Sequence, residues 1–180
     1  MKRDLLAVID MQRVYLEGEW NVPRMREAER NVLRLLPAFA HRVFTRHLPA
    51  AQPAGTWARY NETWKHINDD EEGAQLLESL APYAESCLEK TTYSAFGSSA
   101  FAQEAEQAGR LFICGVQSEF CVLSTVFDAV DRGIDVVYVD DACAGETDQL
   151  EQAVVEIVRR MPCQAALMST DQVLREVRNG

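Results

Sequence analysis

The chain has 180 residues, of which 47% are hydrophobic and 26% charged, and its formal net charge is −10 at pH 7. This length and composition exclude the disordered class and predict one domain, residues 1–180, that folds without disulfides. The negative charge disfavours a nucleic-acid partner, because such binding relies on clustered Lys and Arg.

Short apolar runs alternate with amphipathic stretches along the chain. Strands are expected at residues 4–9, 42–46, 86–90, 110–116, 135–141 and 165–169. Helices are expected at residues 23–40, 74–80, 99–109 (closed by Gly109), after Cys121 as far as Gly133, and at 147–160 and 170–179. Residues 47–73 lack sustained periodicity, which predicts a long loop. This alternation indicates an α/β fold: a three-layer α/β/α domain with a mostly parallel, six-stranded, Rossmann-like sheet.

The apolar runs and the cysteines together indicate the cellular compartment. LFICGV and DVVYV are far too short to span a membrane, and the first residues run into a strand pattern with no signal-peptide apolar region. The five cysteines are scattered and form no C-x-x-C pair of the kind that binds zinc or cycles between redox states. We therefore expect a cytoplasmic protein with no membrane partner.

Three reactive residue types lie where predicted strands end. Asp10 follows the first strand, Lys90 ends the third, and Cys121 lies in the turn GVQSEFC after the fourth. In parallel sheets, ligands bind outside the carboxyl ends of the strands, where the strand order reverses. We therefore expect the three side chains to converge at one edge of the sheet.

These residue types are suited to nucleophilic catalysis. A helix N-terminus and a nearby cation can lower the pKa of a thiol, and Ser118 is a candidate cap that would leave the N–H groups around Phe120 and Cys121 facing a carbonyl oxygen. Asp10 could take the thiol proton, return it to a leaving group and then activate water, while Lys90 polarises the pair.

Each residue also has a plainer interpretation. A cysteine beside a core strand is often a small apolar residue, and we interpret Cys87, Cys114, Cys143 and Cys163 in this way. Taken alone, Asp10 could form a turn and Lys90 could be a solvated surface residue. Only their coincidence at one sheet edge favours catalysis.

The runs VIDMQ, LEKTTYSAF and GVQSEFCVLSTVFDAVDRGIDVVYVDDA carry a family resemblance. From about residue 5 to about residue 167 the chain resembles the isochorismatase-like cysteine hydrolase superfamily, which includes nicotinamidases, carbamoyl-amide hydrolases and isochorismatases. The resemblance implies a catalytic triad of Asp10, Lys90 and Cys121. It also implies a non-proline cis peptide between Val116 and Gln117, an oxyanion hole formed by the N–H groups of Gln117 and Cys121, and a homodimer or homotetramer.

The chain departs from the nicotinamidases at their metal site. Those enzymes carry an Asp-x-His pair after the second strand and a later His, whereas the sequence TRHLPAAQP places His47 and Pro49 there, and only His66 could match the later ligand. This donor set suits a divalent ion poorly. We therefore expect no metal and no other cofactor, disfavour nicotinamide as the substrate, and assign His47 and His66 to the pocket or the surface.

Cys121 itself favours acyl chemistry, since true isochorismatases often carry Gly at the matching position. The leading hypothesis is a metal-independent cysteine hydrolase that cleaves a C–N bond of a small amide, ureido or carbamoyl substrate through a thioester acyl-enzyme. An isochorismatase-type vinyl-ether hydrolase and a non-catalytic binding protein on the same fold remain alternatives. The expected pocket residues are Gln12, Trp57, Tyr60, Tyr93, Phe96 and Phe120, whereas Trp20 and Trp64 are not placed.

Overall fold

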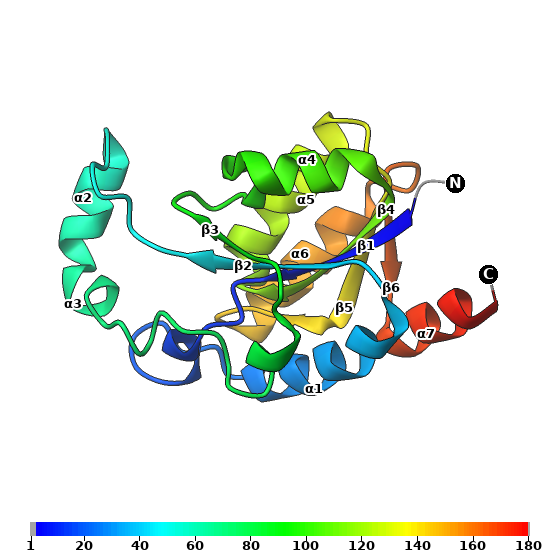
Figure 1. Ribbon diagram of the computed structural model, residues 1–180, viewed down its shortest axis with the longest axis horizontal. Helices are drawn as coiled ribbons and strands as arrows, with labels where there is room; N and C mark the ends of the chain where they lie inside the picture. The colour runs from blue at the N-terminus through cyan, green and yellow to red at the C-terminus, as the bar shows by residue number, and fades with distance from the viewer. Residues whose placement is uncertain (1–2, 180) are drawn as a thin grey trace.

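A six-stranded parallel sheet forms the centre of the computed structural model, which describes residues 3–179 (Figure 1). The strands are β1 Arg3–Ile9, β2 Arg42–His47, β3 Cys87–Lys90, β4 Ala108–Val116, β5 Val136–Ala144 and β6 Ala165–Met168. Their order in the sheet is β3-β2-β1-β4-β5-β6, so the direction of winding reverses between β1 and β4. The predicted α/β class and parallel sheet are confirmed.

The chain contains seven helices within residues 3–179. They are α1 Met25–Leu35, α2 Thr56–Thr63, α3 Lys65–Asn68, α4 Ser99–Gln107, α5 Leu123–Asp131, α6 Asp148–Arg159 and α7 Thr170–Asn179. Five of them, α1 and α4 to α7, pack on the sheet. Helices α1 and α7 lie on one face and α4 and α5 on the other, while α6 packs against β5 and β6 (Figure 1). Within residues 3–179, none of the helices has the length and apolar character needed to cross a bilayer.

The two central strands supply the core. Leu6 to Ile9 of β1 and Leu111 to Cys114 of β4 are fully buried, as expected for strands that are covered on both faces. Phe112 of β4 also packs edge-to-face against Phe39, with ring centroids 4.9 Å apart. Full burial of a large apolar side chain contributes roughly 1.5–3 kcal/mol, so this strand pair anchors the loops that follow it.

The expected loop at residues 47–73 is wrong, because it contains α2 and α3. Trp57, Tyr60 and Trp64 in fact recur at helical spacing. Neither helix contains a buried residue, and both extend away from the sheet at the left of Figure 1. The segment therefore lacks the wide apolar stripe by which a core-packed helix is recognised.

The expected helix at residues 74–80 is also wrong. The N–H of Leu77 donates to the carbonyl of Met11 (2.9 Å), and the N–H of Arg13 donates to that of Gln75 (2.9 Å). This pairing with the chain after β1 replaces helical hydrogen bonds, so tertiary contacts override the helical pattern.

Two predicted helix boundaries also shift. Gly109 closes no helix, because α4 ends at Gln107 and β4 begins at Ala108. The first helix begins at Met25 and gives way after Leu35 to a 3-10 turn at Leu36–Ala38, where Pro37 removes a backbone donor. Both shifts lie within a few residues of the expected ends and leave the order of elements unchanged.

Gly115 allows β4 to approach β1 next to Asp10. Its φ is +118°, and a Cβ at this position would lie 2.1 Å from the carbonyl oxygen of Ile9. Gly133 provides a matched comparison, since its φ is also positive at +71° but no atom lies within 4 Å of its hypothetical Cβ.

We therefore expect Gly115→Ala to lower the free energy of unfolding by about 3 kcal/mol or more, through backbone strain and a backbone clash together. Gly133→Ala, which introduces the strain alone, is expected to cost about 1 kcal/mol. Urea denaturation of the two variants measures both values. Equal losses would show that the β1 to β4 approach does not require glycine.

Candidate active site

Asp10 directly follows β1 and is fully buried. Its backbone lies in the left-handed region, with φ of 48°, a conformation that Asp tolerates better than most residues and that is enriched at functional sites. Thr45 of β2 holds it from the neighbouring strand: the Thr45 hydroxyl donates to Asp10 Oδ1 (2.6 Å) and accepts from the Asp10 N–H (3.2 Å). The second carboxylate oxygen, Oδ2, therefore has a fixed position.

The ammonium of Lys90, at the end of β3, lies against that oxygen. Its Nζ is 2.7 Å from Asp10 Oδ2, and both side chains have no exposed surface. The ammonium directs its hydrogen bonds to the carbonyls of Thr92 and Tyr93 (2.9 Å each) and to Cys121 Sγ (3.3 Å). The two carboxylate oxygens of Asp10 thus face different partners, Oδ1 the Thr45 hydroxyl and Oδ2 the ammonium.

Cys121 lies in a single π-helical turn, Ser118–Val122, that joins β4 to α5, and its side chain is buried. A π-helical turn of this kind is frequent at functional sites. The peptide bond between Val116 and Gln117 is cis, as the family resemblance implied.

Two expectations for this turn are wrong. Ser118 makes no capping hydrogen bond, because Gln117 occupies the N-cap position. The carbonyl of Gln117 accepts the N–H of Phe120 (3.1 Å) and that of Val122 (3.2 Å), so the Phe120 N–H is not free to face a substrate.

Thr125 connects this turn to the loop that follows Lys90. Its hydroxyl donates to the Cys121 carbonyl (2.7 Å) and accepts the N–H of Ala95 (3.0 Å). The backbone of Cys121 and the chain that surrounds the ammonium are therefore fixed relative to each other.

The electrostatics differ from the expected thiolate. Burial raises the pKa of the Cys121 thiol, the Asp10 carboxylate raises it further, and Lys90 lowers it by less. Burial opposes the charge on Lys90, but the neighbouring Asp10 carboxylate favours it, and the pKa of the ammonium is raised. The site therefore holds a neutral thiol beside a charged pair, and a reaction at this thiol would require a base to remove its proton.

A cavity of about 230 Å³ opens over Cys121. Its lining residues are Tyr15, Glu19, Trp20, His47, Tyr60, Trp64, Tyr93, Gln117, Phe120, Cys121 and Glu146. The structure thus places Tyr60, Tyr93 and Phe120 at the pocket, as the sequence predicted. Tyr15, Trp20 and Trp64 were missed there, although Tyr15 and Trp20 follow Asp10 closely and Trp64 shares the helical spacing of Tyr60.

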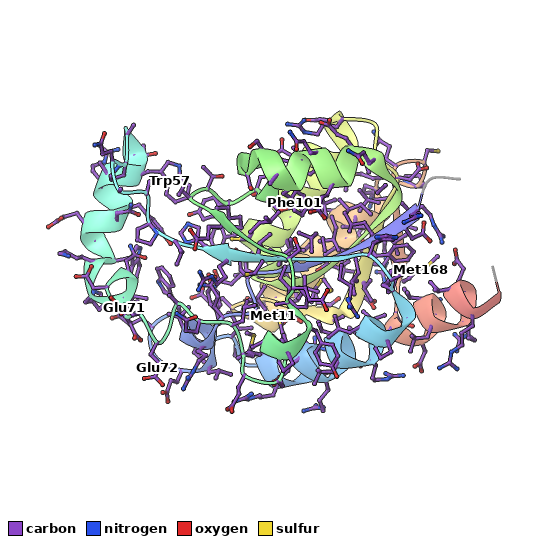
Figure 2. All side chains as sticks on the ribbon, in the orientation of Figure 1. Met11, Trp57, Glu71, Glu72, Phe101 and Met168 are labelled. Carbon is purple, nitrogen blue, oxygen red and sulfur yellow. The ribbon has the colours of Figure 1, made fainter. Side chains whose placement is uncertain are left out.

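The other expected pocket residues lie elsewhere. Trp57, which extends from α2 toward the body of the molecule in Figure 2, packs behind the pocket wall, with its ring 5.0 Å from Tyr93 and 5.2 Å from Tyr60. Phe96 is a core residue that packs edge-to-face on Phe101 at 5.1 Å. These two aromatics therefore support the site without lining it.

Gln12 is buried, and its side chain holds the backbone of His47 in place through hydrogen bonds. Its side-chain oxygen accepts the N–H of His47 (2.8 Å), and its amide donates to the carbonyls of His47 (3.1 Å) and Ala74 (3.0 Å). Burial, and then Lys90, lower the pKa of His47 to about 4, so the imidazole that lines the cavity is neutral near pH 7. His66, by contrast, is exposed and lies 2.8 Å from Glu19.

The sequence places this site in a family. A profile of the Isochorismatase domain matches residues 4–172. The chain belongs to the isochorismatase family. Membership makes it a hydrolase, and the hypothesis of a hydrolase is confirmed at that level.

Relatives of this isochorismatase-family chain share most of its length. The isochorismatase family protein YddQ of Bacillus subtilis is 28% identical over 158 residues, which cover 83% of this chain and 82% of that protein. A cysteine hydrolase from Pseudomonas syringae pv. phaseolicola has the same fold, with a TM-score of 0.83, 18% identity and coverage of 98% and 93% of the two chains. Pyrazinamidase of Pyrococcus horikoshii, solved in complex with zinc, is similar at a TM-score of 0.74, with 22% identity and coverage of 93% and 99%.

The lowered pKa of His47 predicts an NMR result. Because protonation of the folded state is disfavoured, the imidazole should stay neutral as pH falls through 6.5 and take up its proton only near pH 4. The Cε1 proton shifts of the three histidines report this, with His47→Asn used to assign the signal. A His47 midpoint close to the ordinary value would contradict the buried, neutral ring.

The ion pair predicts a strong energetic coupling. Lys90→Met should lower the free energy of unfolding by about 3–5 kcal/mol, because it leaves the Asp10 carboxylate buried without a counter-charge. The double variant Asp10→Asn/Lys90→Met should regain part of this loss, since neither charge remains. Denaturant titration of the two single variants and the double variant measures the coupling; purely additive losses would argue against an energetically coupled pair.

Proposed function

We propose that this protein is a cysteine hydrolase that cleaves a C–N bond of a small amide, ureido or carbamoyl compound without a catalytic metal. One observation carries the proposal: Asp10, Lys90 and the Cys121 thiol meet in a buried cluster at the base of an aromatic cavity. The cluster combines a nucleophile, a carboxylate base and a fixed cation, which are the groups that acyl transfer requires.

Acylation begins when the substrate carbonyl lies over Cys121. Asp10 Oδ2 accepts the thiol proton as Sγ bonds to the carbonyl carbon, and the π electrons of the C=O bond move to its oxygen. The N–H groups of Gln117 and Cys121 stabilise this oxyanion. When the C=O bond re-forms, the C–N bond breaks, Asp10 returns the proton to the leaving nitrogen, and ammonia or an amine departs from a thioester.

Deacylation uses the same groups in reverse. Asp10 removes a proton from water, the hydroxide oxygen attacks the thioester carbonyl, and the C–S bond breaks. The proton then passes from Asp10 to the sulfur, so the enzyme regains a thiol and releases a carboxylic or carbamic acid.

The position of Lys90 explains how a thiol of raised pKa can react. Its ammonium contacts both the proton acceptor and the sulfur, so it offsets the negative charge whether that charge lies on Asp10 or on Cys121. Proton transfer within this cluster moves a charge without changing the net charge of the buried site.

The donors near the cavity do not suit a catalytic metal. Residues 3–179 contain no group of three His, Cys, Asp or Glu side chains arranged to hold an ion. Pro49 provides no ligating atom beside His47, and the His66 ring is engaged by Glu19. The proposed reaction therefore relies on the triad alone.

The cavity also supports amide over isochorismate hydrolysis. Isochorismate carries two carboxylates, whereas the described side chains that line the cavity include Glu19 and Glu146 and no Lys or Arg. Like charges in a partly enclosed site repel each other.

Ammonia release from a panel of small amides, ureas and carbamoyl compounds tests the function. We expect turnover that resists a chelator, falls about a thousandfold or more in Cys121→Ala, and leaves a thioester adduct on Cys121 in rapidly quenched samples. Cys163→Ala, at an exposed thiol outside the site, serves as the matched control. Loss of turnover on chelation, or turnover that survives Cys121→Ala, would contradict the mechanism.

A further inference from the structure

Aromatic rings from four separate segments form a continuous wall around the cavity. Tyr15 and Trp20 follow β1, Tyr60 and Trp64 come from α2 and its end, Tyr93 follows Lys90, and Phe120 precedes Cys121. We call these residues the aromatic wall. Neighbouring ring centroids are 6.1 Å apart for Tyr15 and Trp20, 6.2 Å for Trp20 and Tyr60, 5.6 Å for Trp20 and Trp64, 6.4 Å for Tyr60 and Tyr93, and 5.3 Å for Tyr93 and Phe120.

Core packing does not account for the whole aromatic wall. Tyr15 is buried, but Trp20, Tyr60, Trp64 and Tyr93 keep part of their surface accessible, and Phe120 is 40% exposed. Accessible apolar surface gathered around a cavity is typical of a binding site. Ring faces carry negative electrostatic potential, so they attract cations.

The tyrosines of the wall act as neutral rings. Burial raises the pKa of Tyr15, Tyr60 and Tyr93, so their hydroxyls keep their protons near pH 7. They therefore add ring faces and hydrogen-bonding hydroxyls to the cavity rather than phenolate charges.

The charged groups at the cavity are also negative. Glu19, whose carboxylate also contacts the exposed His66 ring at 2.8 Å, and Glu146 line it, and no Lys or Arg is among the described side chains that do so. His47 is neutral, and the ammonium of Lys90 is paired with Asp10 beneath the thiol. Nothing in the described lining offers a counter-charge to an anionic substrate, whereas a cation would lie among aromatic rings and carboxylates.

We infer that the cavity selects amides whose non-reacting end carries a positive charge, in particular a substituted ammonium group held against the aromatic wall. The inference rests on the proposed amide hydrolysis and names the substrate class for it. The cation takes no part in bond making: the carbonyl end reacts at Cys121 as described, with water as the only co-substrate, and gives a cationic carboxylic acid and ammonia.

A pair of nearly isosteric amides tests this selectivity. 4-(Trimethylammonio)butanamide and 5,5-dimethylhexanamide differ in one atom, N⁺ against C, and their methylene chain insulates the carbonyl from the charge. Homologues with one and two methylenes cover other distances between the amide and the wall. We expect the cationic member of the best pair to have a kcat/KM about tenfold or more above its neutral partner.

Three variants locate the source of the preference. Trp20→Leu keeps an apolar side chain but removes the ring face, and Glu19→Gln removes a carboxylate at the cavity; each should lower the ratio of cationic to neutral kcat/KM several-fold. Glu104→Gln on α4 is the matched control. It removes the same charge from an exposed residue that does not line the cavity, so it should leave the ratio unchanged.

Binding to Cys121→Ala separates this inference from the proposed function. Tryptophan fluorescence titrations with the same amides report selectivity whether or not any amide is hydrolysed. Tighter binding of the cationic amide supports the inference even if turnover is absent, in which case the amidase proposal alone fails. Equal or weaker binding of the cation overturns the inference, even if both amides are hydrolysed in a Cys121-dependent manner.

Discussion

The buried ion pair between Lys90 and Asp10 is the contact on which the rest of the site depends. Removing two such charges from water costs several kcal/mol per ion, so the surrounding chain has to compensate. It does so with the Thr45 hydroxyl on one carboxylate oxygen and with the carbonyls of Thr92 and Tyr93 on the ammonium. The same carbonyl contacts hold the loop after β3 at the site, where Tyr93 lines the cavity.

The strand order explains why the cation is a lysine. Adjacent strands lie about 4.8 Å apart, and β2 separates β3 from β1. Only a long side chain reaches from the end of β3 to a carboxylate at the end of β1, whereas the short Thr45 suffices from β2. Cys121 enters from β4, on the other side of β1, at the point where the winding reverses and a crevice is expected.

The positions of residues at the ends of strands could be predicted from the sequence. The properties that depend on side-chain packing between distant segments could not. Asp10, Lys90 and Cys121 were placed together because parallel strands end at one edge. The neutral state of the thiol depends on complete burial, which local sequence does not report. Trp20 and Trp64 were missed because their contacts join segments that no periodic pattern connects. Residues 74–80 were assigned to a helix because their leucines suit one, yet pairing with the chain after β1 decides their conformation.

The position of helix α2 determines how the cavity can be altered. It supplies Tyr60 to the cavity and Trp57 behind it, yet it contains no buried residue and lies apart from the layers that hold the sheet together (Figure 1). Substitutions on this helix therefore alter the shape and polarity of the cavity without entering the core around the sheet. Asp10, Lys90 and Cys121, in contrast, are buried at the ends of the strands, where most changes are destabilising. This separation makes α2 the natural segment to vary when new specificities are selected in the laboratory.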